Sequence, residues 1–301
     1  MSVTVKGYAK INLHLDVVGF LDDGYHSVEN VMQSISICDE ITVTPIEQNV
    51  FSVECDLPDV PSGDGNIATR AARLFFEAIN ACGGARIEIK KRIPMAAGLA
   101  GGSADAAATL VALNLLFNEP LSKEELCAIG AKLGADVPFC IMCGASYSDK
   151  RGDELHAFPS LPDGIVIVVA CGGEGVSTPW GYRLLDQTFS NFENYIPRGT
   201  DGLKTALERG DKYSFCDELF NIFEQPVLSM RPVAAHIRRI MLENGAIKAM
   251  MSGSGPSVFG VFADVESAKT VENMLKGEGY FAQVAEPVSA EEARGIKTLI
   301  K

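Results

Sequence analysis

The 301-residue sequence lacks a hydrophobic run long enough to cross a bilayer. Its longest unbroken apolar stretch covers residues 165–171, whereas a membrane-spanning helix needs about 20 apolar residues. The first ten residues, MSVTVKGYAK, contain neither the apolar segment nor the small-residue cleavage site of a secretory signal. We therefore expect a cytoplasmic location and no membrane partner.

Basic clusters are equally scarce. The chain has 39 acidic and 26 basic residues, which gives a net charge of −13, and its longest run of Lys and Arg spans residues 90–92. Nonspecific binding of nucleic acids requires a basic surface that displaces counterions from the phosphates. The charge argues against a nucleic-acid partner. It leaves a small phosphorylated ligand open, because a few local donors can bind one.

Patterns for disulfides or metal sites are weak as well. Eight cysteines are present, and Cys140 and Cys143 form a lone C-x-x-C without a second pair or a nearby His. Both lie in the apolar stretch VPFCIMCG, where a thiol packs as a small hydrophobic group. Without a secretory signal we expect reduced thiols. A metal or redox role for the pair is the less favoured alternative.

The length and composition predict an α+β protein of two domains. Hydrophobic residues make up 47% of the chain and charged residues 22%, as in ordinary globular proteins, and one domain typically takes about 150 residues. We place the boundary in the connector HAFPSLPDG, residues 156–164. This divides the chain into domains at 1–157 and 158–301.

Hydrophobic periodicity predicts strands and helices in both halves. Asn66 is the expected N-cap of a helix, and Ser122 and Glu125 have the spacing of a capping box. Strand–helix–strand order with interspersed glycine predicts a small α+β sandwich in the second half. The predicted strands cover 35–45, 85–89, 165–170, 257–262 and 282–287. The predicted helical regions cover 66–79, 103–117, 122–133, 180–224, 233–243 and 265–275.

A glycine-rich segment, PMAAGLAGGSADA at residues 94–106, carries the strongest chemical signal. It follows a predicted strand and opens a predicted helix, whose free N–H groups and dipole favour a bound anion. Gly98, Gly101 and Gly102 permit close approach and dihedrals that other residues rarely adopt. Ser103, the expected N-cap, adds a hydroxyl for a phosphate or its magnesium. The alternative is a glycine-rich turn that serves only helix–sheet packing. The segment has the pattern of neither a Walker loop nor a dinucleotide-binding fingerprint.

Three segments give the chain a family resemblance. The glycine-rich segment at 94–114 resembles the phosphate-binding signature of the GHMP kinases. Residues 9–13, AKINL, resemble the N-terminal strand of that superfamily, and residues 251–259, MSGSGPSVF, resemble its C-terminal glycine loop. The three matches occur in the expected order and span most of the chain.

Three further motifs narrow the resemblance. DGYH at 23–26, LGADVPF at 133–139 and VSTPWGY at 176–182 resemble the 4-diphosphocytidyl-2-C-methyl-D-erythritol kinase family. This implies the two-domain GHMP kinase fold, with an N-terminal ribosomal-protein-like left-handed βαβ domain and a C-terminal ferredoxin-like α/β sandwich. It also implies ATP-dependent phosphorylation of a 2-hydroxyl on a small cytidine diphosphate derivative, with Mg²⁺, in the nonmevalonate isoprenoid pathway. The expected state is a monomer or homodimer.

The resemblance implies roles for individual residues. Asp136 would accept the proton of the substrate hydroxyl, because an alcohol is a poor nucleophile at neutral pH. Lys10 would hold Asp136 ionised and stabilise charge on the hydroxyl oxygen or the migrating phosphoryl group. Asn12 would bind the substrate near that hydroxyl. Without the resemblance, Lys10 and Asp136 would each be interpreted as a solvated surface charge.

The nucleotide sites follow in the same way. Tyr25, His26 and Tyr182 would form the cytidine pocket, since rings stack on a base and a His can bind its edge. Taken alone, a Tyr-His pair is equally compatible with a buried turn. Ser103 is the expected magnesium ligand. The expected ATP-binding residues are Pro94, Met95, Ala96, Ala97, Gly98, Leu99, Ala100, Gly101, Gly102, Ser103 and Ala104.

Some residues depart from the family pattern. Lys150 stands where a glycine is usual, Cys171-Gly-Gly replaces a common Lys-Pro or His-Pro step, and Asn221-Ile-Phe-Glu224 replaces Asn-Asp-Leu-Glu. Two alternatives therefore stay open: another GHMP small-molecule kinase of the homoserine or mevalonate type, or a catalytically silent binding protein on the same scaffold. Residues 23–26 and Tyr182 favour a nucleotide substrate. The presence of both Lys10 and Asp136 argues against a catalytically silent binding protein.

Overall fold

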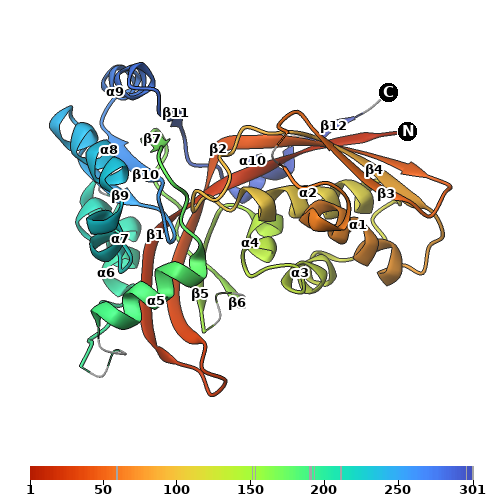
Figure 1. The fold of residues 1–301 in the computed structure, drawn as a ribbon, viewed down its shortest axis with the longest axis horizontal. Helices are drawn as coiled ribbons and strands as arrows, with labels where there is room; N and C mark the ends of the chain where they lie inside the picture. Colours follow the sequence, from red (N-terminus) through yellow and green to blue (C-terminus); the bar gives the residue numbers. More distant parts are fainter. Residues whose placement is uncertain are drawn as a thin grey trace.

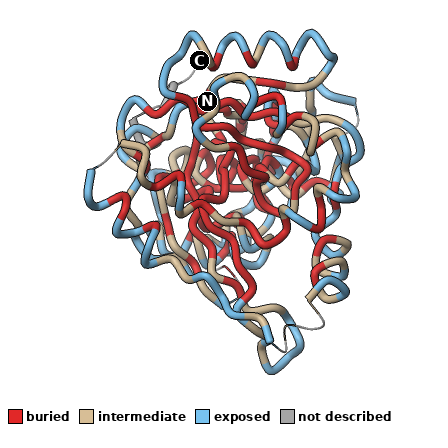
Figure 2. The backbone as a smooth tube through the Cα atoms, turned by 90° about the vertical axis from the view of Figure 1, so that its left-hand side faces the viewer, coloured by how far each residue is buried: buried red, intermediate tan, exposed pale blue. Residues whose placement is uncertain are grey.

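Two sheets and the helices packed on them make up the protein (Figure 1). The computed structural model describes residues 1–299 except 59, 151, 153, 190, 191, 193, 211 and 296. Buried backbone gathers in the strands at the middle of the molecule (Figure 2). Among the described residues, no helix combines the length and apolarity needed to cross a membrane.

The first sheet is organised around a long hairpin of β1 (Val3–Phe20) and β2 (His26–Ile46). Its order is β12-β1-β2-β4-β3, where β4 spans Gly84–Lys90, β3 Phe51–Cys55 and β12 Lys297–Leu299. β5 (Ala145–Asp149) pairs with β2 and with β6 (Glu154–Ala157), and β8 (Phe220–Asn221) pairs with β1. The predicted strand at 35–45 is therefore the second half of a much longer strand.

Helices of the first half cover one face of this sheet. β3, α1 (Ile67–Ala78) and β4 form a βαβ unit, because β3 and β4 pair in parallel. Asn66 caps α1 as predicted, since its side chain accepts from the Ala68 N–H at 2.8 Å. α2 (Gly101–Leu116) is apolar on nearly every side and packs against β1 and β2. This packing fixes the position of the first turn of α2, which directly follows the glycine-rich segment.

Two short helices follow α2. α3 (Lys123–Ala131) begins with the predicted capping box, in which Ser122 and Glu125 bond each other's backbone N–H groups. α3 ends two residues before the predicted Leu133, because α4 (Asp136–Met142) begins a separate helix at Asp136. That break places Asp136 at the first position of a helix.

The second sheet has the order β11-β7-β10-β9, all antiparallel. Along the chain it runs β7 (Val166–Cys171), α8 (Pro232–Glu243), β9 (Lys248–Met251), β10 (Val258–Phe262), α9 (Val265–Gly277) and β11 (Phe281–Ala285). This is the βαββαβ order of a ferredoxin-like unit, as predicted. Alternating residues of β7 face two different apolar clusters, which explains its continuous hydrophobic run.

The region predicted as helical at 180–224 is only partly so. It contains α5 (Thr178–Thr188), α6 (Asp201–Glu208) and strand β8, and α7 (Glu224–Met230) follows it. Positions 190, 191, 193 and 211 lie outside the described residues. Strands β8 and β12 and helix α10 (Ala290–Gly295) belong to the second half in sequence, yet both strands pair with β1 of the first sheet. The division at 157/158 stays a prediction.

All eight cysteines are free thiols. Cys140 and Cys143 lie at the end of α4, where the Cys143 thiol donates to the Cys140 carbonyl at 3.2 Å. Burial raises the pKa of Cys143 to about 11 and that of Cys140 well above its ordinary value. Both thiols are therefore protonated at neutral pH, which is the state expected of packing groups.

Candidate active site

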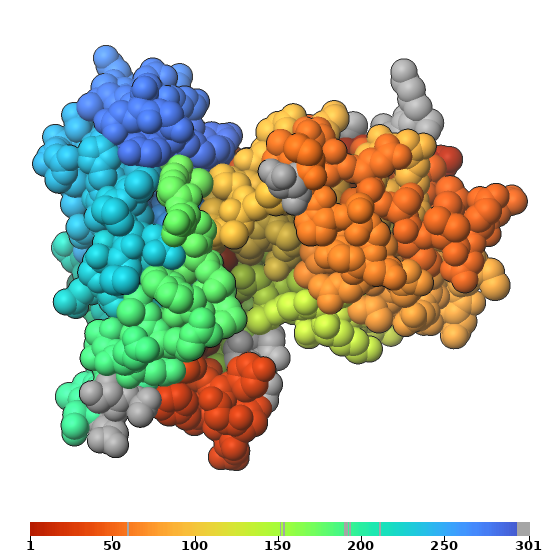
Figure 3. All heavy atoms as spheres, in the orientation of Figure 1, coloured from red at the N-terminus to blue at the C-terminus, as the bar shows by residue number. Residues whose placement is uncertain are grey.

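A cavity of about 640 Å³ opens where the second half of the chain faces the helices of the first (Figure 3). Its walls come from β1, the segment at 94–103, the start of α4, residues 176–182 and the loop at 253–254. Of the predicted residues, it brings together Lys10, Asn12, Asp136, Tyr182 and, from the glycine-rich segment, residues 94–98 and 100–103. Leu99 and Ala104 are buried and do not line it. Tyr25 and His26 are not among its lining residues.

The glycine-rich segment is held in an unusual backbone conformation. Ala96, Gly98 and Ala100 have φ values of 50°, 79° and 57°, so two of the three left-handed positions belong to alanine. Of the three glycines expected to permit such dihedrals, only Gly98 adopts one, and Gly101 and Gly102 are helical. Backbone that alternates left-handed and right-handed residues can turn successive N–H groups to one side, which is the geometry of many anion-binding loops.

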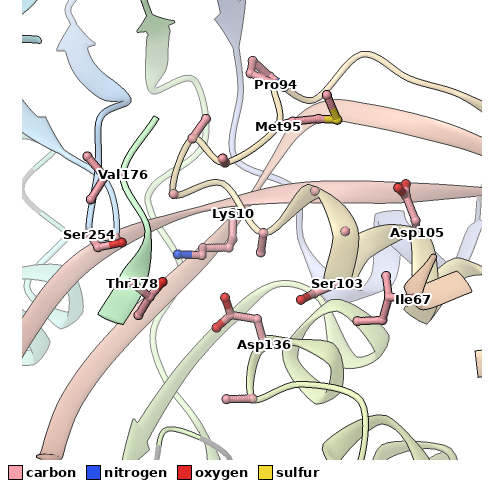
Figure 4. A pocket seen from close by; sticks show the side chains of 18 of the residues that line it. Lys10, Ile67, Pro94, Met95, Ser103, Asp105, Asp136, Val176, Thr178 and Ser254 are labelled. Carbon is pink, nitrogen blue, oxygen red and sulfur yellow. The ribbon is translucent and has the colours of Figure 1, made fainter. Parts of the chain in front are cut away.

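Helix α2 begins earlier than predicted. Ala100 occupies the N-cap position, and Ser103 is the third residue of the helix. The prediction that Ser103 caps the helix is wrong, because the chain turns helical as soon as it leaves the left-handed Ala100. Gly101 is required by packing: a Cβ there would lie 3.0 Å from Ile93 Cγ2 and 3.1 Å from Lys91 Nζ. The Ser103 side chain faces the cavity (Figure 4).

Lys10 is 4% exposed, and its ammonium donates to Asn12 Oδ1 at 2.6 Å. The register of the β1–β2 pair shifts just before Lys10 and just after Asn12. Such bulges re-aim side chains, and here they bracket the two residues that face the cavity. Burial lowers the pKa of Lys10, and the attraction of Asp136 opposes that shift.

Asp136 approaches Lys10 without forming a contact ion pair. The half-buried carboxylate projects from the first residue of α4 into the space that the Lys10 ammonium also faces (Figure 4). Within the part of the chain that the structure describes, no nitrogen–oxygen pair of these two residues lies within 4.0 Å. The gap leaves room for another group between the Asp136 side chain and the Lys10 ammonium.

Asn12 is committed to other protein groups. Its amide oxygen accepts from Lys10 and from Ser252 Oγ at 3.3 Å, and its amide nitrogen donates to Asn30 Oδ1 at 2.7 Å. Ser252 Oγ also lies 3.0 Å from the Gly98 carbonyl. The chain of contacts joins β1, the segment at 94–103 and the C-terminal glycine loop. Asn12 therefore orients Lys10 in this structure.

The C-terminal glycine loop, residues 252–257, is held by Asn221. The amide nitrogen of Asn221 donates to the Met251 and Gly253 carbonyls at 2.7 and 2.9 Å, and its oxygen accepts from the Phe223 N–H at 2.9 Å. Gly253 has φ 58° and a Cβ there would lie 3.3 Å from Lys10 Nζ. Asn221 thus fixes the loop against the ammonium.

The three predicted cytidine residues are only partly assembled. His26 stacks on Tyr182 with ring centroids 4.5 Å apart and an interplanar angle of 30°. His26 Nε2 lies 2.7 Å from Asp186 Oδ1, and Phe20 packs against the same imidazole. Tyr25 is 65% exposed. The ring pair is pre-formed, whereas Tyr25 stands at the turn of the β1–β2 hairpin.

Sequence reasoning did not single out several residues that line the site. Thr178 and Ser254 place hydroxyls near the Lys10 ammonium (Figure 4). Both lie in motifs that carried the family resemblance, and that position was the signal that could have found them. Lys91 and Asp105 also line the cavity. Neither gave a usable signal, because their partners are distant in sequence.

The donors at the loop are those that magnesium prefers. Ser103 and Asp136 offer hard oxygen atoms to the cavity, and Mg²⁺ is usually held by one or two such groups together with substrate phosphates. In the described ranges, the one cluster of three potential metal-binding side chains is Asp149, Glu154 and His156 of the β5–β6 hairpin, which includes none of them. The residues at the loop therefore fit a phosphate-bound ion better than a protein cage.

Comparisons with known proteins agree with this arrangement. Residues 66–144 match the family described as GHMP kinases N terminal domain, and residues 203–280 match GHMP kinases C terminal. The chain is similar to a 4-diphosphocytidyl-2-C-methyl-D-erythritol kinase of Pelobacter propionicus, with 41% identity over 95% of this chain and 99% of the relative.

Solved structures show the same likeness. A 4-(cytidine 5'-diphospho)-2C-methyl-D-erythritol kinase superposes with a TM-score of 0.77 at 31% identity, covering 94% of this chain and 98% of that one. A homoserine kinase from Cytophaga hutchinsonii reaches a TM-score of 0.71 at 18% identity, over 95% and 97% of the two chains, and shares the fold alone. The chain belongs to the GHMP kinases and, within them, to the 4-diphosphocytidyl-2-C-methyl-D-erythritol kinase family.

Proposed function

We propose that the protein transfers the γ-phosphoryl group of ATP to the 2-hydroxyl of 4-diphosphocytidyl-2-C-methyl-D-erythritol. One observation carries the proposal beyond family membership: Lys10 and Asp136 face the same space beside the anion-binding loop. Phosphoryl transfer depends on positioning and on neutralising charge, and this cavity offers a proton acceptor, a cation and a loop of backbone donors together.

The reacting groups have complementary roles in this proposal. As the oxygen of the 2-hydroxyl attacks the γ-phosphorus, Asp136 accepts the hydroxyl proton, the bond from the γ-phosphorus to the β–γ bridging oxygen breaks, and ADP leaves. The Lys10 ammonium, oriented by Asn12, stabilises negative charge on the attacking oxygen and on the migrating phosphoryl group. The segment at residues 94–104 binds ATP, and its backbone N–H groups, which Pro94 lacks, donate to the phosphates. Ser103 holds magnesium, which supplies charge neutralisation at the phosphate oxygens when bound.

The cytidine end of the substrate is proposed to lie toward Tyr182. The stack of His26 on Tyr182 supports this, because it presents a ready aromatic surface next to the cavity wall. Tyr25 would complete the pocket from the hairpin turn once substrate binds. We also propose the cytoplasm as the compartment, where ATP is supplied. A monomer or homodimer stays the expected state.

Substrate dependence tests the proposal. Purified protein with Mg-ATP should release ADP when 4-diphosphocytidyl-2-C-methyl-D-erythritol is added, and mass spectrometry should find one added phosphate on that compound. Homoserine and mevalonate serve as parallel acceptors. Turnover of either one without turnover of the cytidine compound would contradict the proposal, and absence of turnover with all three would favour a silent binding protein.

A further inference from the structure

A buried ionic triad lies directly behind the phosphate-binding loop. Lys91 Nζ stands 2.6 Å from Asp39 Oδ2 and 2.6 Å from Asp105 Oδ2. The three residues are 5%, 0% and 3% exposed. They lie in three separate parts of the fold: Asp39 in β2, Lys91 directly after the end of β4, and Asp105 in α2. The triad therefore links the sheet to the helix that opens the anion site.

The triad holds both ends of the loop. At the entry, Asp39 Oδ1 accepts from the backbone N–H groups of Arg92 and Ile93 at 2.5 and 2.8 Å. At the exit, Asp105 lies in the first turns of α2, and Lys91 Nζ lies so close to Gly101 that a Cβ would meet it at 3.1 Å. Lys91 thus links Asp39, which binds the entry of the loop, to Asp105 of α2, the helix at its exit.

The ammonium of Lys91 is unsuited to be a phosphate ligand itself. Both of its short contacts are carboxyl oxygens, of Asp39 and of Asp105, whose pKa burial raises to about 8, so two of its three N–H donors are already engaged by the protein. Its pKa is raised, although burial acts the other way, because Asp105 and Asp39 favour the charged form. Lys91 therefore acts through the geometry it imposes.

Stability alone is a weak reason for such a triad. Buried ion pairs lose much of their attraction to desolvation, and apolar residues of similar volume often replace them without loss of stability. Lys91 and Asp105 also form part of the cavity wall. Asp105 Oδ1 has no hydrogen-bond partner within the described part of the chain. A set of buried charges at a binding wall, incompletely paired, points to a role in the site.

We propose that the Asp39–Lys91–Asp105 triad is a positioning device for the phosphate-binding loop, which keeps the loop entry and the start of α2 at the separation that ATP phosphates require. The inference rests on the proposed kinase function. It concerns the triphosphate end of the nucleotide, so losing the triad weakens binding of the phosphates and leaves binding of the nucleoside unchanged.

The test compares two substitutions at one position. Asp105→Ala removes the link to Lys91, whereas Asp105→Asn keeps an oxygen that can accept from it. We expect Asp105→Ala to raise the KM for ATP about tenfold, the effect of losing one charge-assisted hydrogen bond. The KM for the acceptor should stay within twofold. Asp105→Asn should restore the ATP KM to within about threefold of the parent value.

Calorimetry separates positioning from general damage. In the presence of magnesium, Asp105→Ala should weaken binding of a non-hydrolysable ATP analogue about tenfold and leave adenosine binding unchanged. The matched control is Asn114→Ala, which removes two hydrogen bonds to Leu121 from the same helix and should leave both affinities unchanged. Equal loss of both ligands in Asp105→Ala, or unchanged affinity for both, overturns the inference.

A second variant covers the case in which Asp105→Ala does not fold. Gly101→Ala keeps all three side chains of the triad but places a methyl group against Lys91 Nζ and Ile93, so it pushes the first residue of α2 away from Lys91. It should show the same phosphate-selective loss, and unchanged affinity for the ATP analogue would refute the proposal. If the unmodified protein binds no ATP analogue, the proposed kinase function fails instead.

Discussion

The ammonium of Lys10 is bound by the amide oxygen of Asn12 at 2.6 Å, two residues along the same strand. Register shifts in the β1–β2 pair flank both residues, and the amide nitrogen of Asn12 is fixed in turn by Asn30. Asn12 is thereby held in one amide orientation, with its oxygen toward the lysine. The cation of the site is positioned by a neutral neighbour and not by an ion pair with Asp136.

Replacing Asn12 should therefore affect turnover more than binding. In Asn12→Ala the Lys10 ammonium loses its acceptor and rotates away from the reacting group, so we expect kcat to fall about tenfold to a hundredfold, at nearly constant KM for ATP. Steady-state kinetics measure both. Ser148→Ala is the control: Ser148 is buried opposite Asn30, and its hydroxyl has no partner in the described structure. Its kinetics should match the parent.

Removing the proposed proton acceptor should stop the chemistry and spare nucleotide binding. Asp136→Asn keeps the shape of the side chain but no longer accepts a proton, so kcat should fall by about 10²–10⁴. Calorimetry with a non-hydrolysable ATP analogue should give a Kd within twofold of the parent. Asp264→Asn, at the N-cap of α9, is the matched control. Unchanged turnover in Asp136→Asn would remove Asp136 from this role.

The C-terminal glycine loop should depend on Asn221. Asn221→Ala loses three buried hydrogen bonds, each contributing about 1 kcal/mol, so the free energy of unfolding should fall by about 3 kcal/mol. The freed loop no longer supports Lys10, and kcat should fall as well. Urea denaturation and kinetics measure the two effects. Asn244→Ala, which loses one bond at the end of α8, should reduce stability less and leave kcat unchanged.

Acid should destabilise the fold through His14. The imidazole is fully buried, and burial, aided by the charge of Arg198, lowers its pKa to about 4. The unfolded chain takes up the proton near pH 6.5, so protons favour unfolding below that pH. As the pH falls from about 6.5 to 4, His14 lowers the free energy of unfolding, and at pH 4 this loss of stability reaches about 3 kcal/mol.

Denaturation at a series of pH values tests this. In His14→Leu the fall in unfolding free energy between pH 6.5 and 4 should be smaller than in the parent by about 2–3 kcal/mol. Asp16, Glu29 and Glu224 have raised pKa values through burial and act in the opposite direction. The comparison therefore uses the difference between the two proteins, and equal slopes would contradict the assignment to His14.

The parts predicted best are those governed by neighbours in the chain. Asn66 and the Ser122–Glu125 box cap their helices because the partners lie two or three residues away. The succession of strands and helices predicted a small α+β sandwich in the second half, whereas its ferredoxin-like order came from the family resemblance and the strand β9 was not predicted. The N-cap of α2 was misplaced at Ser103, since no sequence signal announces an alanine in the left-handed region.

By itself, the sequence determined the family and many of the helices and strands, because periodicity, caps and motifs are local properties. The tertiary structure decided which side chains meet. Ser252 reaches Asn12 across 240 positions, and Lys91 joins Asp39 and Asp105 across 52 and 14. Such contacts depend on strand register and helix packing, where a shift of one residue turns a side chain to the opposite face.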